Sequence, residues 1–492
     1  MQNGKRMHPM AMIAAYIKTV KEVFFLFILL FIVNIASHAW WVELGRVLFI
    51  AYLVYRLFAV VLEWMRTRYV LSEEAVELDQ GVFTRKHRSI PYQRVQNVQS
   101  KTPFYLQPFG LTSLTLETGA EGDESSLTFG ALKVEEAKRI EETLNAYRNR
   151  TTHKETEAVS EEYVVDEQME VEQDVPIHHK KTIHFTPTRK DILKASVLSF
   201  SYVLLIPVLL SIFQNIDEVY DVSTMAEDAY DFLVRSWYLI LAVIVVFILI
   251  AVSFGLIRTY LKYGKYEISS DDERIYIRSG VLNEQYFSIR KQNVQAVKIE
   301  QSLLKRMLKL AEVKLVSAGS LDFAGEEINS LYPFLPADRA YTLIEELLPG
   351  FEVKTDMERL PRRSLVARFI RIPWIWLIGT GLLIFFKPEL WFLSFVLLAL
   401  TVFYRIMDYN VTRFLTHGKF IQFRSGGFSA TTFITTRNKV IEFELKQSRL
   451  KKRFGLATIE TTNRAKPVHV QTLADITSDM AQEAFVWYSR RE

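Results

Sequence analysis

The sequence predicts an α+β membrane protein in which three transmembrane helix hairpins alternate with three cytoplasmic β domains, each closed by a C-terminal helix. Three observations carry this prediction. Apolar segments of bilayer-spanning length occur in pairs, Lys and Arg gather on one side of these segments, and a block of 36 residues occurs three times in a chain of 492. A length near 500 also favours about three domains.

The apolar pairs predict six membrane-spanning helices. They cover about 23–39 and 47–65, then 195–214 and 237–257, and finally 370–386 and 390–406. Each segment approaches the roughly 20 residues that a helix needs to cross a bilayer. None shows the polar face of a surface helix, which is the alternative for an apolar helix of this length.

The distribution of Lys and Arg predicts the orientation, because cytoplasmic ends of membrane helices are enriched in them. One side of the predicted helices is rich in these residues, while the longest loop on the other side, 215–236, is acidic. We therefore expect a multi-pass protein of the plasma membrane with both termini and all three repeats in the cytoplasm. The first segment lacks a signal-peptide cleavage site, so we expect it to remain as a helix.

The repeated block is the middle part of each soluble domain. The copies are residues 81–116, 280–315 and 426–461, superimposed without a gap at offsets of 199 and 146. Short period-two segments such as Ile275 and Ile277 precede the block and predict half-buried strands. The glycine that opens each block suits a turn with positive φ. Helical stretches at 133–148, 337–348 and 473–489 end the three domains.

These elements predict nine successive segments. We expect a cytoplasmic N-terminus, hairpin 1, domain one, an acidic disordered linker, hairpin 2, domain two, a second linker, hairpin 3 and domain three. In this order their bounds are 1–22, 23–65, 66–150, 151–188, 189–258, 259–352, 353–369, 370–407 and 408–492.

The domains resemble a known family. The motif Ile90-Pro-Tyr-Gln-Arg-Val-Gln-Asn-Val98, together with Gln447-Ser448 and Gly455-Leu456, resembles the bacterial pleckstrin-homology (PH) domain of the second type. A helix hairpin before each of three such domains resembles the YdbT-like membrane proteins of Gram-positive bacteria. The resemblance implies a bent antiparallel β-barrel closed by a C-terminal helix. It also implies a hetero-complex with a smaller protein of the same family, but it assigns no activity.

The copies depart from one another. Domain two has Lys309 where the other copies have Gly110 and Gly455, and domain three replaces the Ile-x-x-Gln pattern by Thr435-Thr-Arg-Asn438. The three domains therefore need not bind the same ligand.

The residue inventory argues against catalysis and cofactors. The chain has no cysteine, which excludes thiolate chemistry, and its net charge of +4 gives no reason to expect nucleic acid. His178, His179 and His184 lack the spacing of a metal site. Ser302 with Lys305, and Ser448 with Lys451, match Ser-x-x-Lys, but the accompanying motifs of that enzyme class are missing. We expect no enzyme activity, no metal and no cofactor.

Basic residues beside the repeated block are the candidates for contact with anionic lipid. They are Arg85, Lys86 and Arg88 in domain one, Lys305, Arg306 and Lys309 in domain two, and Lys446, Arg449, Lys451, Lys452 and Arg453 in domain three. Near an anionic membrane surface each Lys or Arg contributes about 1 kcal/mol. Ordinary positive-inside bias on a solvated surface explains the same residues equally well.

Two polar residues lie inside predicted membrane helices. Arg56 is the one charge deep within a crossing, and Asn34 on the other helix of the hairpin is its expected partner. We interpret the chain as a non-enzymatic scaffold or binding protein that presents its domains at the membrane, in envelope stress or antimicrobial resistance. A component of a transporter or export complex is the alternative, for which Arg56 would be needed.

Overall fold

The computed structural model describes the larger part of the chain. The described residues are 4–35, 37, 39–81, 84–118, 126–144, 146–147, 181–198, 237–317, 322–323, 326–327, 330–465 and 468–490. The chain divides into two compact units. Unit 1 contains Met1–Lys180, Thr186–Glu267 and Tyr276–Ser288, and unit 2 contains Lys181–Phe185, Ile268–Ile275 and Ile289–Glu492. Residues 151–180 of the predicted linker and the acidic loop 215–236 lie outside the described residues.

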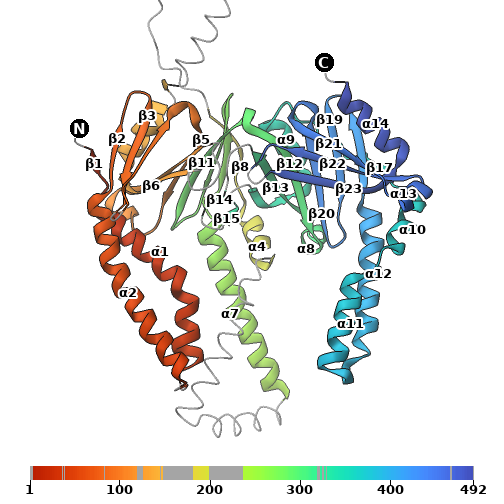
Figure 1. The fold of residues 1–492 in the computed structure, drawn as a ribbon, viewed down its shortest axis with the longest axis horizontal. Coiled ribbons are helices and arrows are strands. Elements are labelled where there is room, and N and C mark those ends of the chain that lie inside the picture. The colour runs from red at the N-terminus through yellow and green to blue at the C-terminus, as the bar shows by residue number, and fades with distance from the viewer. Residues whose placement is uncertain are drawn as a thin grey trace, which may run out of the picture. The chain divides into compact units, whose positions relative to one another are not determined.

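Unit 1 contains domain one in two antiparallel sheets (Figure 1). The first sheet has the order β1 (Lys5–Arg6), β2 (Arg68–Leu71), β3 (Ala75–Gln80) and β4 (Lys86–Pro91). The second has the consecutive strands β7 (Ser126–Lys133), β6 (Leu111–Thr118), β5 (Val95–Thr102) and β11 (Glu284–Arg290). Both sheets contribute to one core, which the helix at 134–144 enters with Ala137, Ile140 and Leu144.

Besides the helix at 134–144, unit 1 contains α1 (Met10–Phe27), α2 (Trp40–Arg66), α4 (Arg189–Leu198) and α7 (Trp237–Tyr263). A π-helix over Ile28–Val33 continues α1, and the chain leaves it at Asn34. The first helix therefore begins and ends earlier than the predicted segment 23–39. A turn at Asn34 follows the π-helix. Arg46 of α2 reaches back to it and donates to the carbonyls of Leu30 and Asn34.

Unit 2 contains one seven-stranded antiparallel sheet built from domains two and three. Its order is β16 (Ser330–Pro336), β13 (Leu310–Ser317), β12 (Val294–Ser302), β20 (Ser429–Thr436), β19 (Phe420–Ser425), β18 (Arg413–His417) and β17 (Glu358–Arg359). A three-stranded sheet follows, with β21 (Val440–Lys446), β22 (Leu456–Asn463) and β23 (His469–Thr477). β8 (Thr182–Phe185) pairs with β9 (Glu267–Ser270), and β14 (Asp322–Phe323) pairs with β15 (Glu326–Glu327) in a two-stranded sheet. The boundary between the units runs through β9, β10 (Arg274–Ser279) and β11.

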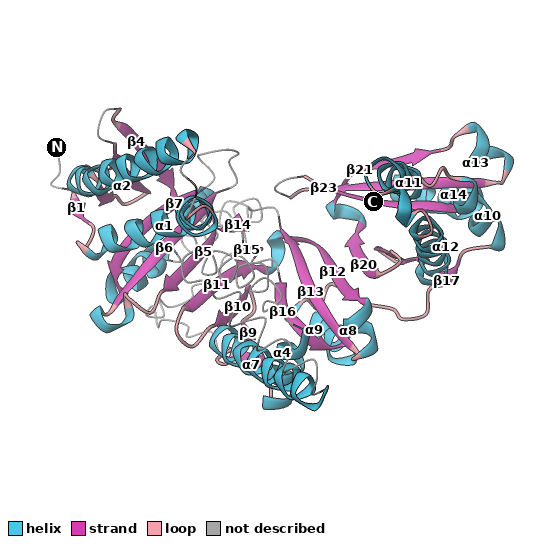
Figure 2. Cartoon of the chain, turned by 90° about the horizontal axis from the view of Figure 1, so that it is seen from below, coloured by secondary structure: helices cyan, strands magenta, loops and turns pink. Residues whose placement is uncertain are grey.

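Unit 2 also has seven described helices. They are α8 (Leu303–Met307), α9 (Ala337–Leu347), α10 (Arg362–Ile370), α11 (Trp374–Phe386), α12 (Leu393–Val411), α13 (Arg449–Arg453) and α14 (Ser478–Ser489). Ala481, Ala484 and Trp487 of α14 belong to the core of domain three. The two views agree that α13 lies beside α10 (Figures 1 and 2).

Three spans among the described residues are long and apolar enough to cross a membrane: Trp40–Arg66, Arg362–Phe386 and Leu393–Val411. They correspond to three of the six predicted crossings. The span 362–386 comprises α10 and α11, which separate at Pro373, where the backbone cannot donate to the preceding turn. Arg405 of α12 satisfies the carbonyls freed there, because its guanidinium donates to Phe369 O at 3.0 Å and Arg371 O at 2.7 Å.

The expected barrels do not form among the described residues, because every described sheet is open. The reason is an exchange of partners between copies. The outer edge of β5 in domain one pairs with β11, which follows the glycine of domain two. In unit 2 the outer edge of β12 pairs in the same way with β20 of domain three. Each of these edges is joined to the next copy instead of closing its own domain.

A short strand before the membrane helices was not predicted from the sequence. β1, β8 and β17 pair with β2, β9 and β18, the first strands after the corresponding membrane segments. Each short strand has a buried apolar residue at or beside its end, followed shortly by proline. These buried residues are Met7, Phe185 and Leu360, and the prolines are Pro9, Pro187 and Pro361. The predicted segments 1–22, 151–188 and 353–369 therefore contribute strands to the sheets.

The glycine prediction is confirmed. Gly81, Gly280 and Gly426 have φ values of 112°, 90° and 111°. A Cβ at any of them would lie about 2.0 Å from the carbonyl oxygen three residues later, so another residue would force the turn open.

Candidate functional site

Strand register identifies the end of each domain that adjoins the membrane helices. Arg68, which follows α2, lies opposite Asp79, and Arg413, which follows α12, lies opposite Arg424. The glycine turns that follow Asp79 and Arg424 therefore lie at the ends of those helices. In domain three this contact is direct, because the backbone N–H of Gly426 donates to a carboxylate of α12 at 3.1 Å.

In Figure 1 the short helix α8 lies at the lower edge of the sheet of unit 2, and the short helix α13 lies at its right edge beside α10. Their N-caps are Ser302 and Ser448, whose hydroxyl oxygens accept from the backbone N–H of Lys305 and Lys451 at 3.3 Å. Capping thus accounts for the Ser-x-x-Lys spacing without any nucleophile. The helices expose apolar side chains as well, with Met307 78% exposed. Mixed basic and apolar exposure suits the interfacial region of a bilayer.

Four arginines form the most unusual charge arrangement at this end. Arg359 of β17 lies directly opposite Arg413 of β18, which lies directly opposite Arg424 of β19. Arg306 of α8 adjoins Arg424. We call these four residues the arginine row. Like charges directly opposite in antiparallel strands are destabilising, so the row needs a compensating group.

The arginine row has no carboxylate partner among the described residues. Arg413 donates to Thr412 O at 2.8 Å, and Arg424 donates to Gln301 Oε1 at 3.0 Å. Buried guanidinium nitrogens of Arg306 and Arg424 have no hydrogen-bond partner. Burial, and then the neighbouring arginines, lower the pKa of Arg306 and Arg413. Forked guanidinium donors that lack a partner match the geometry of phosphate or carboxylate oxygens.

A second charge cluster ties domain three to its membrane helices. Asp475 of β23 is fully buried and has a φ of 63°, at a bulge between β22 and β23. Its carboxylate lies 3.6 Å from Arg368 Nε and 3.2 Å from Lys451 Nζ, and it accepts a hydrogen bond from Arg371. Arg368 also pairs with Asp408 of α12 at 3.0 Å. Asp475 thereby joins α10 to α13, and Asp408 joins α10 to α12.

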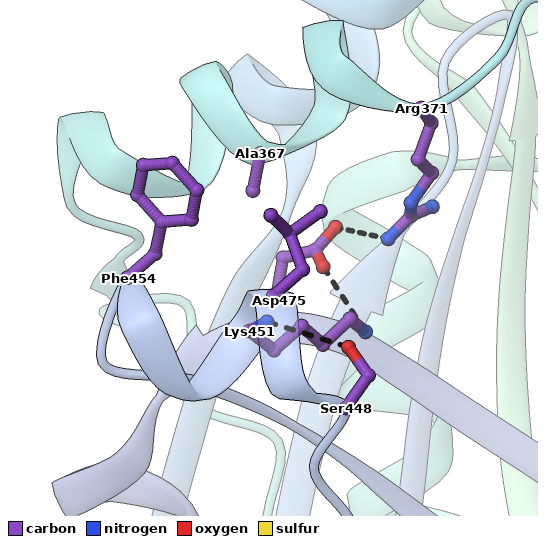
Figure 3. A pocket seen from close by; sticks show the side chains of 7 residues that line it. Ala367, Arg371, Ser448, Lys451, Phe454 and Asp475 are labelled. Atoms are coloured by element: carbon purple, nitrogen blue, oxygen red, sulfur yellow. Dashed lines mark hydrogen bonds and ion pairs between the residues drawn. The ribbon is translucent and has the colours of Figure 1, made fainter.

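A small pocket of about 220 Å³ opens above this cluster (Figure 3). It is lined by Ala367, Arg371, Ser448, Leu450, Lys451, Phe454 and Asp475. Lys451 and Arg371 both turn toward Asp475 at its floor. The cations already neutralise the carboxylate at the floor of this pocket. We therefore interpret the pocket as part of the contact between the helices and domain three.

The other copies fill the bulge position differently. Strand register places Phe334 in domain two and Ala131 in domain one at the position of Asp475, two residues before the strand residue that pairs with the start of β13, β6 or β22. The Nζ atom of Lys305 lies 5.4 Å from the centre of the Phe334 ring and 2.6 Å from a carboxylate oxygen of Glu312. In domain one, the backbone of His8 donates to Ala131 O at 3.2 Å.

The remaining predicted contact residues are distributed over three surfaces. Lys309 is exposed with a φ of 54°, so it adopts the left-handed backbone of its glycine counterparts. Arg449, Lys452 and Arg453 are exposed on α13. Lys446 pairs with two glutamates, at 2.8 and 3.0 Å.

In domain one, Arg85 and Lys86 are exposed, whereas Arg88 donates to Ser126 O at 3.1 Å.

The polar residues of the first hairpin do not pair as expected. Arg56 lies 3.2 Å from Thr19 Oγ1 of α1 and 3.7 Å from Glu63 of its own helix. Asn34 instead donates to Leu29 O at 2.8 Å and accepts from Arg46 through its backbone. Arg56 therefore has a charged neighbour, Glu63, about two turns further along the same face of α2. Of the three histidines considered for metal, only His184 is described, and it contacts Glu346 and Ser270.

Sequence reasoning named Arg306 as a candidate for lipid contact, but it missed Asp475, Arg368 and the other three members of the arginine row. A signal for Asp475 was present, since an aspartate interrupts the apolar end of β23 where the other copies have alanine and phenylalanine. No comparable signal marked the row, because Arg359, Arg413 and Arg424 become neighbours through strand pairing alone.

The fold and the site define a class: a membrane-spanning protein with three small PH-like β domains. The chain belongs to the bacterial PH domain family, whose model matches residues 17–148, 221–350 and 367–492. It is similar to the UPF0699 transmembrane protein YdbT of Bacillus subtilis (strain 168), with 25% identity over 501 residues that cover 99% of each chain. No solved structure matches the chain significantly.

Proposed function

We propose that this chain is a non-enzymatic scaffold that holds its PH-like domains against anionic lipid at the cytoplasmic face of the plasma membrane. The arginine row is the observation that carries the proposal. It concentrates four positive charges, of which Arg306, Arg413 and Arg424 are partly buried, close to the end of α12. None of the four pairs with a carboxylate among the described residues. A lipid phosphate would supply the compensating charge at the depth where headgroups lie.

The experiment compares lipid retention by the full chain in nanodiscs of phosphatidylcholine with and without phosphatidylglycerol. Native mass spectrometry counts the anionic lipids retained after partial delipidation. The variant Arg306→Gln/Arg424→Gln should lose at least threefold of this retention. Arg490→Gln serves as the control, because Arg490 is exposed beyond α14, away from the membrane helices. Equal retention by wild type and the double variant would refute the lipid contact.

The wider role follows the same reasoning. A scaffold that reads anionic headgroups suits envelope stress or resistance to membrane-active antimicrobials, since both alter the exposed lipid. The proposal includes a hetero-complex with a smaller protein of the same family. A deletion strain that tolerates such antimicrobials as well as its parent would count against this role.

A transporter or export component is the second candidate, and Arg56 is the observation that favours it. The Nε atom of Arg56 is buried without a hydrogen-bond partner, and the guanidinium spans from Thr19 to Glu63. Ionisable groups inside membrane helices often mark transport paths. An Arg56→Leu variant that stays folded but loses the cellular phenotype would favour transport over the scaffold. Unchanged phenotype would leave Arg56 as a structural pair.

A further inference from the structure

The two junctions between copies use the same strands in the same register. In unit 1, Val98 of β5 lies opposite Ser288 of β11. In unit 2, Val297 of β12 lies opposite Ile434 of β20. The repeat offsets of 199 and 146 convert the first pair into the second. Two independent junctions with one register define a pairing rule for this domain. The strand after the short 3-10 turn of one copy (β5 or β12) pairs with the strand before the equivalent turn of the next copy (β11 or β20).

In a chain of three copies this rule leaves two strand edges without a partner copy: β4 in domain one and β21 in domain three. β4 of domain one has only β3 as a described neighbour, and β21 of domain three has only β22. Exposure shows the difference from the paired strands. Ser89 on β4 is exposed, whereas its counterpart Ser288 is fully buried. Leu445 on β21 is 38% exposed, whereas its counterpart Ile299 is 2% exposed.

The charges on the two edges are complementary. β21 carries Glu442 and Glu444, while β4 and the residue before it carry Arg85, Lys86 and Arg88. Open edges invite pairing, and opposite charges select the partner edge. Two copies of β21 would repel each other, as would two copies of β4. Complementarity therefore favours β21 with β4.

We propose that β21 of one chain pairs antiparallel with β4 of a second copy of this chain. The pairing rule then places Phe443 opposite Ser89, Glu444 opposite Arg88 and Leu445 opposite His87. One like-charged pair, Lys446 with Lys86, falls at the end of the ladder, and Lys446 is already paired with Glu444 and Glu460. The contact is head-to-tail, so it joins chains into a ring or an open row. It goes beyond the proposed function, which does not require self-association.

The absence of native cysteine makes the register directly testable. Leu445→Cys and His87→Cys are placed in two differently tagged full-length chains, co-expressed and oxidised in native membrane vesicles. The proposal expects a covalent dimer carrying both tags, at least fivefold above that of either variant alone. The control replaces His87→Cys by Ser89→Cys, two residues out of register. Disulfides do not form when Cα atoms are more than about 7 Å apart, so this control should crosslink weakly.

Charge exchange provides a second, independent readout. Glu444→Lys should lower co-purification of differently tagged chains at least fivefold, and mixing it with Arg88→Glu chains should restore the association. Three results would overturn the proposal. They are no dimer from the matched cysteine pair, equal crosslinking in the shifted register, or no loss of co-purification in the Glu444→Lys chain.

Discussion

Domains two and three carry the same bulge and the same short capped helix, yet they fill the position with opposite chemistry. In domain two Phe334 faces the cation of Lys305, whose charge is met by Glu312. In domain three Asp475 gathers cations from α10 and α13. The bulge is thus a backbone feature that both domains share. The side chain at the bulge position decides whether the domain is joined to the membrane helices by ion pairs.

The largest effect should come from removing the buried carboxylate. Asp475→Asn removes the carboxylate that Arg368, Arg371 and Lys451 share, and breaking a buried ion pair costs about 3–5 kcal/mol. Local opening of α10 and β23 should become correspondingly easier, as measured by hydrogen exchange of the full chain in nanodiscs. Domain one should keep its protection.

Asp479→Asn is the matched control, because Asp479 is exposed in the first turn of α14 of the same domain. It should change the exchange of α10 by less than about 0.5 kcal/mol. If the two variants behave alike, Asp475 does not join α10 to the domain, and the contrast with Phe334 fails.

A smaller effect is expected at the same position in domain two. Phe334→Leu keeps most of the apolar volume and removes the ring that faces Lys305, so it should cost about 1 kcal/mol. Hydrogen exchange of β16 measures it. A loss as large as that of Asp475→Asn would show that packing at the bulge position, and not the charge of its side chain, sets the stability of the domain.

Acid should destabilise domain three through His469. Burial, and then the charge of Lys298, lower the pKa of His469 to about 4 from its ordinary value of 6.5. The unfolded chain therefore binds more protons between these values, so the stability of the domain should fall as pH decreases from 6.5 toward 4.

His469→Gln should reduce this part of the pH dependence, as followed by exchange of β23 between pH 7 and pH 5. An unchanged pH profile in the variant would assign the effect to other groups.

Several features were predictable because they depend on local sequence. The turn at Gly81 and its counterparts requires positive φ, which glycine alone adopts without strain. The membrane spans follow from apolar length. The short strands β1, β8 and β17 were missed because two to four residues carry too little periodicity to be recognised.

The sequence by itself determined the three copies, their membrane helices and the strand faces, since these depend on neighbours along the chain. Only the tertiary structure decided which strand lies beside which. Period two assigns a residue to a face of a sheet but names no partner strand, so the arginine row remained invisible until β17, β18 and β19 were paired. The barrels implied by the family resemblance do not form for the same reason. The outer edges of β5 and β12 pair with the next copy, a choice made by segments far apart in the chain.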